Sequence, residues 1–281
     1  LRRGISEDHI ISKRYTEMDI PENITAKQMY DELLEAMKGK DHCYLLLDEI
    51  QEIDGWEKAV NSLLEGADAD IYVTGSNSKL MSSEISTYLT GRYVSIPVYT
   101  LSFKEYLDFK ADSTLSRKEL LAEYIRFGGF PIIALSEYDE QSAYQIVNGI
   151  YHTVVSRDIV KRHRINKQDL FDRVVKYIIE NMGKTFSANS ISTFLKSEHR
   201  KVSVESIYNY LRWLEQAFII YPCERYDLQG KSILKTQEKY YLSDVSLKYA
   251  LLGYNRKMLD GAMENIVFLE LKRRGYDVLI G

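Results

Sequence analysis

Apolar and polar positions along the first part of the chain predict a parallel α/β sheet. Short apolar runs, typical of strands buried on both faces, alternate with stretches of helical spacing. A strand, a helix and a strand within about thirty residues form a βαβ unit, which requires a right-handed crossover. The predicted strands are residues 9–12, 44–48, 71–74 and 94–98. The predicted helices are residues 25–38, 55–65 and 81–89, one that opens at 101–106, and 117–127.

The remainder of the chain is predicted to be mainly helical, with a different order of elements. The breaker Gly128-Gly129-Phe130-Pro131 ends the preceding helix, and we place a domain boundary between residues 135 and 136. A helix–turn–helix followed by a β-hairpin is the pattern of a winged helix, which we predict for residues 185–243. The other predicted elements are helices at 139–163, 168–182 and 262–274 and a strand at 276–280.

Composition limits the class of protein. The chain has 281 residues, of which 45% are apolar and 28% charged, as expected for a globular protein. Apolar runs are too short to span a bilayer, and two distant cysteines, Cys43 and Cys223, fit a reducing cytoplasm. Residues 1–149 hold 15 Lys/Arg and 26 Asp/Glu, a net of −11, whereas residues 150–281 hold 22 and 15, a net of +7. This asymmetry indicates two modules, the second better suited to nucleic acid.

The run Tyr44–Asp48 ends in two adjacent carboxylates, Asp48 and Glu49. In parallel sheets ligands bind beyond the carboxyl ends of the strands, where both side chains would emerge. Two acids there suit a Mg²⁺–nucleotide site, with one near the metal and the other aimed at a water molecule. Alternatively, they only begin the next loop and helix, where carboxylates are favoured. These residues alone do not decide between the two.

Several motifs, taken together and in this order, resemble the prokaryotic AAA-type P-loop ATPases. The motifs of the first part are Leu46–Gln51, Trp56, Thr74–Asn77, Leu89–Arg92 and Leu101–Tyr106. Those of the second part resemble an uncharacterised C-terminal domain of the same family, and they are Phe127–Pro131, Ser156–Ile159, Lys239–Asp244 and Glu264–Val267. The resemblance implies an ATPase core over residues 1–135. Residues 136–281 would then form a helical segment (139–182), a winged helix and the start of a restriction-endonuclease-like α/β fold (260–281).

The resemblance also implies roles for individual residues. Asp48 would hold Mg²⁺ through its coordination shell, and Glu49 would polarise the water that attacks ATP. Ser76 or Asn77 would orient that water or touch the γ-phosphate, unless the two residues only form a strand-to-helix turn. Arg92 would act on the γ-phosphate, in cis or from a neighbouring subunit, unless it is a surface or ion-pairing arginine.

Basic residues of the predicted winged helix would meet the phosphates of duplex DNA, with one at the tip of the wing. These residues are Lys196, Arg200, Lys201, Arg212 and, at the wing tip, Lys231. Against this, winged helices often bind proteins, and Glu198, Glu205 and Glu215 dilute the positive face. Duplex DNA and another protein therefore both remain candidate partners, and the oligomeric state stays open.

Members of this family carry a Gly-rich phosphate loop that ends in Gly-Lys-Ser/Thr. Gly183-Lys184-Thr185 imitates its end, but Ile178 stands where the first Gly is required, so Gly183 is better explained as a helix C-cap. We expect the loop to precede Leu1 and the nuclease metal-binding acids to follow Ile280, with Glu264 as one candidate member of that metal site.

The function expected from these features is an ATP-binding and ATP-hydrolysing parent protein that uses Mg²⁺. Its nucleotide state would be coupled to the C-terminal winged helix, and this chain alone would lack activity. The alternative is a DNA-binding or protein-tethering module with a vestigial ATPase half.

Overall fold

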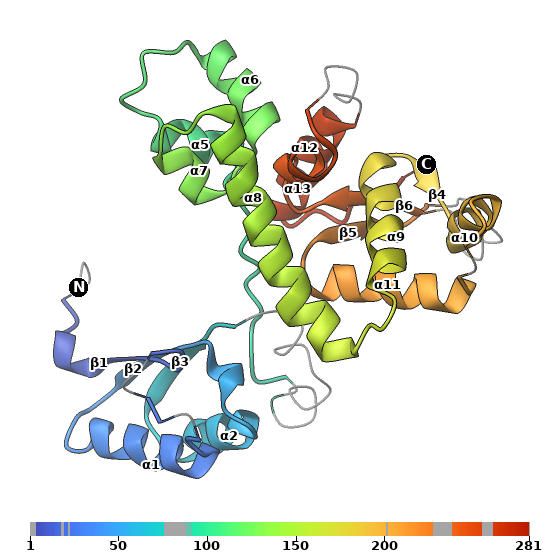
Figure 1. Ribbon diagram of the computed structural model, residues 1–281. Coiled ribbons are helices and arrows are strands. Elements are labelled where there is room, and N and C mark those ends of the chain that lie inside the picture. The colour runs from blue at the N-terminus through green and yellow to red at the C-terminus, as the bar shows by residue number, and fades with distance from the viewer. Residues whose placement is uncertain are drawn as a thin grey trace. The chain divides into compact units, whose positions relative to one another are not determined.

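The computed structural model describes residues 4–17, 20–21, 23–75, 89, 91–200, 202–226, 238–254 and 261–280. The chain divides into two compact units, residues 1–95 and 96–281 (Figure 1). Residues 96–135 thus belong with the second unit, whereas the sequence placed them with the first. The reason is packing: Tyr106, Leu120, Tyr124 and Ala134 form a small core against which Ile266 is partly buried.

A three-stranded parallel sheet forms the centre of the first unit. Its strands are β1 (Ile10–Arg14), β2 (Cys43–Asp48) and β3 (Ala69–Val73), hydrogen-bonded in the order β1-β2-β3. In this register Arg14 lies opposite Asp48, and Leu47 lies opposite Val73. All three strands therefore end at the same edge of the sheet. The predicted parallel α/β architecture is confirmed for these strands.

Helices α1 (Ala26–Met37) and α2 (Trp56–Gly66) lie on one face of this sheet (Figure 1). Alternate residues of β2 point to that face, so Cys43, Leu45 and Leu47 are buried in one core with Leu33 and Leu63. Thr25 caps α1 in a capping box with Gln28, which confirms the predicted helix start. Short 3-10 turns, η1 (Glu7–His9) and η2 (Ile50–Glu52), precede β1 and follow β2.

Two predicted elements near the end of the first unit have different outcomes. The predicted helix 81–89 lies outside the described residues, apart from Leu89. The predicted strand 94–98 is wrong, because the structure gives these residues no regular secondary structure and leaves Val94 and Val98 exposed. A strand needs a neighbour to pair with, and Pro97 has no N–H to donate to one. The apolar pattern alone could not supply that partner.

Helices dominate the first part of the second unit. They are α5 (Phe103–Phe109), α6 (Arg117–Phe127), α7 (Pro131–Leu135), α8 (Glu140–Val154) and α9 (Gln168–Glu180). Ser102 and Glu105 form the predicted capping box at the start of α5. A π-helical segment, η3 (Val155–Lys161), continues α8 without a break, so one long helix leads towards α9 (Figure 1).

The last part of the second unit combines helices with an antiparallel sheet. β4 (Thr185–Phe186), β5 (Ile220–Cys223) and β6 (Glu238–Leu242) are ordered β4-β6-β5. Helices α10 (Ala188–Ser197) and α11 (Val204–Gln216) separate β4 from β5, and α12 (Ser246–Leu252) and α13 (Ala262–Arg273) follow. The predicted strand 276–280 is reduced to a single bridge between Ile280 and Arg225. The winged-helix and nuclease-like classifications stay predictions.

A buried carboxylate, Asp244, joins distant parts of the second unit. Its Oδ2 accepts a hydrogen bond from the Gly129 N–H at 2.8 Å, and its Oδ1 accepts one from the Ser246 N–H at 2.9 Å. The loop that carries Gly129 is in turn joined to Leu101, whose N–H donates to the Gly129 carbonyl at 2.7 Å. These bonds join the segments around Leu101 and Gly129 to the residues that follow β6.

Within the described ranges, no helix combines the length and the apolar character needed to cross a membrane.

Candidate functional site

Asp48 stands at the carboxyl end of the central strand, where the sequence placed it. Arg14, at the end of β1, donates from Nε to Asp48 Oδ2 at 3.0 Å. Thr74, which follows β3, donates its hydroxyl proton to Asp48 Oδ1. The Asp48 side chain remains 42% exposed, so it is open to a ligand. Neither Arg14 nor Thr74 was given a role from the sequence, although each directly follows or ends an apolar strand.

Glu49 adopts an unusual backbone conformation. Its φ of 54° and ψ of 40° lie in the left-handed region, which residues other than glycine rarely occupy. Its N–H donates to Thr74 Oγ1 at 3.3 Å, and its carboxylate accepts a hydrogen bond from Gln51 Nε2. Such strained positions are often found at functional sites, where surrounding contacts maintain them. Here the Thr74 hydroxyl and the Gln51 amide are those contacts.

Gln51 is a further site residue that the sequence did not assign. Its side chain is only 7% exposed and holds one oxygen of Glu49. The other end of its amide, Oε1, is buried without a hydrogen-bond partner in the described part of the chain. Buried polar atoms are normally satisfied, so this oxygen is suited to a donor such as an ordered water molecule.

The electrostatics at this edge favour an ionised Asp48. The hydrogen bond from Thr74 and then that from Arg14 lower the pKa of Asp48 below its ordinary value, against the opposing effect of burial. A carboxylate that stays charged at neutral pH is the oxygen ligand that Mg²⁺ prefers. No cluster of three or more acidic, His or Cys metal ligands occurs among the described residues. A Mg²⁺ ion at Asp48 would therefore take most of its ligands from phosphates and water, as is usual for Mg²⁺–nucleotide sites.

Arg92 is not brought to the acid pair. Its guanidinium donates to Asn61 Oδ1 and to Glu65 Oε1, both at 2.8 Å and both on α2. The hydrogen bond from Arg92 is the main reason that the pKa of Glu65 is lowered. Helix α2 starts after the carboxyl end of β2 and ends before the amino end of β3, so Glu65 lies towards the opposite edge of the sheet from Asp48. The other predicted site residues of this unit, Ser76 and Asn77, lie outside the described residues.

The predicted DNA-contacting residues differ in their surroundings. Arg200 Nη1 lies 2.5 Å from Asp169 Oδ2 and is engaged in that ion pair. Lys196 and Arg212 are exposed, whereas Lys201 and Lys231 lie outside the described residues. Arg200 is therefore less available to a phosphate than the sequence suggested.

Glu264, named as one candidate member of a nuclease metal site, is held by structural contacts. Its Oε1 accepts hydrogen bonds from Lys239 Nζ and from the Tyr241 hydroxyl, both at 2.7 Å. These contacts fix α13 to β6. They leave the nuclease role without support among the described residues.

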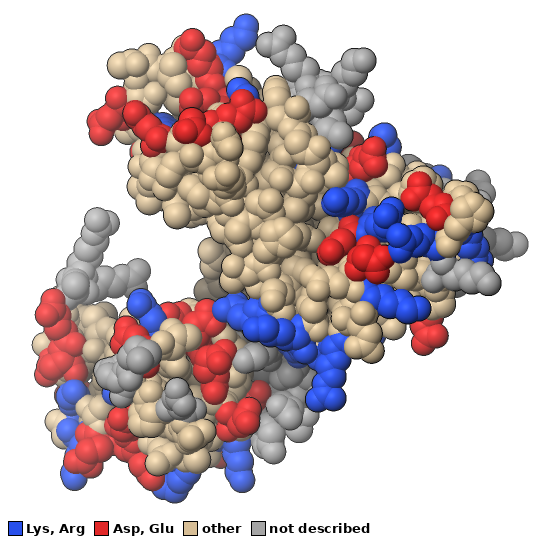
Figure 2. Space-filling view, in the orientation of Figure 1, with Lys and Arg blue, Asp and Glu red and all other residues tan. Residues whose placement is uncertain are grey.

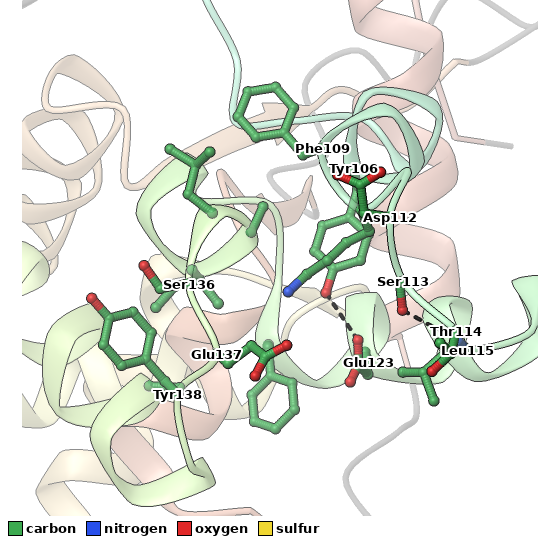
Figure 3. Close-up of a pocket in the computed structure, with 16 residues that line it drawn as sticks. Tyr106, Phe109, Asp112, Ser113, Thr114, Leu115, Glu123, Ser136, Glu137 and Tyr138 are labelled. Carbon is green, nitrogen blue, oxygen red and sulfur yellow. Dashed lines mark hydrogen bonds between the residues drawn. The ribbon is translucent and has the colours of Figure 1, made fainter.

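A pocket of about 610 Å³ lies in the second unit, at a place that the sequence did not indicate (Figure 3). Helices α5, α6 and α7 surround it, and the Tyr106 hydroxyl donates to Glu123 Oε2 at 3.3 Å within it. Phe109, Leu115 and Glu137 also line it. None of the predicted ATPase or DNA-contacting residues does.

Comparisons with known proteins agree with this geometry. Residues 5–107 match the family model of the AAA domain, and residues 118–257 match that of a domain of unknown function. An uncharacterised protein of Haemophilus influenzae is 36% identical over 283 residues, which cover 100% of this chain and 70% of that protein. The chain belongs to this family of AAA-domain proteins. The acid pair Asp48–Glu49 falls inside the AAA domain.

One further relative and one solved structure are similar to this chain. An uncharacterised protein of Methanocaldococcus jannaschii is 36% identical over 265 residues, which are 90% of this chain and 58% of that protein. A Walker-type ATPase of Pyrococcus abyssi has a similar fold, with a TM-score of 0.53 over 86% of this chain and 84% of that structure, at 13% identity. Together with the AAA-domain match, this similarity of fold supports a P-loop α/β core.

Proposed function

We propose that the full-length AAA-domain protein binds ATP with Mg²⁺ and hydrolyses it at the carboxyl edge of the first unit's sheet. One observation carries this proposal. A single hydroxyl, that of Thr74, donates to the carboxylate of Asp48 and accepts from the backbone N–H of Glu49. Two adjacent acids are thus held in place by the neighbouring parallel strand, at the edge where ligands of such sheets bind.

The two acids would have different tasks. Asp48 is exposed and kept ionised by Thr74 and Arg14, so it would hold Mg²⁺, which neutralises charge on the phosphates of ATP. Glu49 is oriented by Gln51 and would accept a proton from, or align, the attacking water. Because Arg14 now occupies one oxygen of Asp48, that guanidinium would have to share the carboxylate with the metal or move towards a phosphate.

Other roles are proposed with the same logic. Ser76 or Asn77 would sense the γ-phosphate, since in the sequence they come three and four residues after Val73, the last residue of β3. Arg92 contacts Glu65 on α2, towards the opposite edge of the sheet from Asp48. If Arg92 acts on ATP, it would therefore act on ATP bound by a neighbouring subunit. We also propose a cytoplasmic location, because both cysteines, Cys43 and Cys223, are free.

The second unit would respond to the nucleotide state. The order β4, α10, α11, β5, β6, with β6 between the other two strands, supports a winged helix that binds duplex DNA or a protein. The competing function is such a binding module with a vestigial ATPase half. Mg²⁺-dependent hydrolysis by the full-length protein separates the two, because a vestigial site would not turn over.

The test compares full-length wild-type protein with the variants Asp48→Asn and Asp54→Asn. Asp54 is an exposed acid close in sequence and serves as the matched control. We expect Mg²⁺-dependent ATP hydrolysis in the wild type and in the control, and a loss of at least about 100-fold for Asp48→Asn. Equal activity in all three proteins would contradict the proposed metal role.

A further inference from the structure

A group of four cations at the turn between η3 and α9 is exposed and unpaired. Lys161, Arg162, Arg164 and Lys167 are all exposed, and none forms an ion pair with another residue of the described ranges. Residues 157–167 hold five Lys/Arg and one Asp, a net of +4. Figure 2 shows basic side chains over the end of the long helix that η3 completes. We call these four residues the basic turn.

Two nearby arginines, unlike the residues of the basic turn, form ion pairs with acids. Arg200 is bound to Asp169, and Arg173 Nη1 lies 3.5 Å from Glu198 Oε2. Both are therefore partly neutralised by acids of the same unit. The basic turn has no such acid partner among the described residues, so its positive potential is available to an external anion.

Helix-end stability explains only part of this arrangement. Cations at the end of η3 are favoured by the helix dipole, which accounts for Lys161 and Arg162. Arg164, however, has a φ of 49°, in the left-handed region where glycine or asparagine is preferred. Lys167 is the N-cap of α9, where a cation is unfavourable and Ser, Thr, Asp or Asn is preferred. Arg164 and Lys167 thus occupy positions where another residue type would stabilise the local backbone better. This suggests that their charges serve to bind a ligand.

The turn is fixed against α11. The ring of His163 stacks on that of Trp213, with centroids 4.1 Å apart and an interplanar angle of 9°. At the end of η3, the Ile165 N–H donates to the Val160 carbonyl at 3.2 Å. Arg212, exposed and without an ion pair in the described part of the chain, precedes Trp213 on α11. The cations are therefore carried by ordered helix ends beside the second helix of the α10–α11 pair.

We propose that the basic turn, together with Arg212, binds the phosphate backbone of duplex DNA. In helix–turn–helix proteins the second helix enters the major groove while flanking cations contact phosphates, and α11 with the adjacent turn fits that division. Duplex RNA is disfavoured as the partner, because its deep and narrow major groove does not admit a helix. A membrane surface is disfavoured too, since residues 155–169, all of them described, include no exposed large apolar side chain to insert.

This inference rests on the winged helix proposed for the second unit but not on the ATPase proposal, and it replaces most of the DNA contacts expected from the sequence. Arg212 is common to both sets. The binding surface shifts from the loop around Arg200 to the end of η3.

The experiment measures binding of full-length protein to a fluorescent 30-base-pair duplex by anisotropy, over a range of salt concentrations. The test variant is Lys161→Gln/Arg162→Gln/Lys167→Gln. The matched control is Lys104→Gln/Arg117→Gln/Lys118→Gln, which removes the same charge from exposed positions on α5 and α6. We expect wild type and control to bind alike, and the test variant to bind at least about 30-fold more weakly at low salt. Its slope of log affinity against log salt should be smaller by about two to three, because each lost phosphate contact contributes about 0.9.

Several outcomes would overturn the proposal. They are equal weakening in the test and control variants, an unchanged salt slope, and stronger binding to duplex RNA or to anionic phospholipid vesicles than to duplex DNA. Thermal unfolding of each variant shows whether it is folded. If the triple variant unfolds, the single change Arg162→Gln, which leaves Arg164 and the α9 N-cap residue Lys167 unchanged, should still weaken binding several-fold. ATP hydrolysis is assayed separately, so a negative result for DNA leaves the ATPase proposal unaffected.

Discussion

Thr74 donates its hydroxyl proton to the carboxylate of Asp48, across the junction of two neighbouring parallel strands. The same oxygen accepts the N–H of Glu49 at 3.3 Å. One side chain therefore influences both the charge of the first acid and the backbone conformation of the second. This relationship explains why two adjacent carboxylates can differ in role.

Replacing Thr74 with Val should raise the pKa of Asp48 towards its ordinary value, because the hydrogen bond from Thr74 is the largest cause of the lowered pKa. A lowered pKa stabilises the fold above the ordinary value of 3.8, and this contribution is lost as the pH falls through the folded-state pKa. The measurement is a ¹³C NMR titration of the Asp side-chain carboxyls. Thr74→Ser keeps the hydroxyl and should titrate like wild type. An unchanged Asp48 titration in Thr74→Val would refute the assignment.

Replacing Gly128 or Gly129 with Ala should destabilise the second unit by about 2–4 kcal/mol, since a buried clash forces backbone shifts. A Cβ on Gly128 would lie 1.8 Å from Asp244 Oδ1, and one on Gly129 would lie 2.3 Å from the Leu101 carbonyl oxygen. Gly128 also has a φ of +75°. Urea unfolding measures the change.

The control for these substitutions is Gly149→Ala in α8, where a Cβ would meet nothing within 4 Å. It should stabilise the protein by about 0.5–1 kcal/mol, because Ala is the better helix former. If Gly128→Ala and Gly149→Ala shift the unfolding midpoint alike, the proposed close approach of Gly128 to Asp244 is wrong.

Burial raises the pKa of Asp244, although its hydrogen bonds with Ser246 and Gly129 oppose this effect. Between the ordinary value and the raised pKa, the native state keeps a proton that the unfolded chain has lost. The free energy of unfolding should therefore decrease as the pH rises through that interval, and level off above it. Asp244→Asn should remove this decrease. Urea unfolding of both proteins between pH 4 and pH 8 measures it, and identical pH dependence in the two would show that Asp244 is not its source.

Much of the first unit's architecture could be predicted from the sequence, because apolar runs and helix caps act locally. The strands ending at Asp48 and Val73 and the caps at Thr25 and Ser102 are confirmed. The strand at 94–98 was wrong, since a strand also requires a partner that periodicity does not reveal. The position of residues 96–135 was missed for a similar reason. It depends on contacts between residues far apart in sequence, which are the packing of Ile266 on the Tyr106 core and the hydrogen bond to Asp244 from the Gly129 N–H, 115 residues away.

At the candidate site, too, residues that form a short local pattern could be predicted, whereas residues brought together by the fold could not. Asp48 and Glu49 were predicted because a strand that ends in carboxylates is visible in a short stretch of sequence. Arg14 and Thr74 were not, because only the parallel register brings the ends of β1 and β3 to Asp48. Arg92 was proposed to act on the γ-phosphate because of the motif that contains it. Its hydrogen bonds with Asn61 and Glu65 instead place its side chain against α2. The positions of these three side chains depend on which strands and helices contact each other, and the spacing of residues within one element does not reveal such contacts.

The most direct test of the central claim is the variant Glu49→Gln in the full-length protein, with Glu35→Gln on the surface of α1 as the control. Equilibrium binding of a fluorescent ATP analogue and Mg²⁺-dependent phosphate release are measured on the same samples. The account predicts that Glu49→Gln binds the analogue within about threefold of wild type and loses turnover by about 100-fold or more, because Glu49 acts on water rather than on the nucleotide. Phosphate release by Glu49→Gln at the wild-type rate would contradict it.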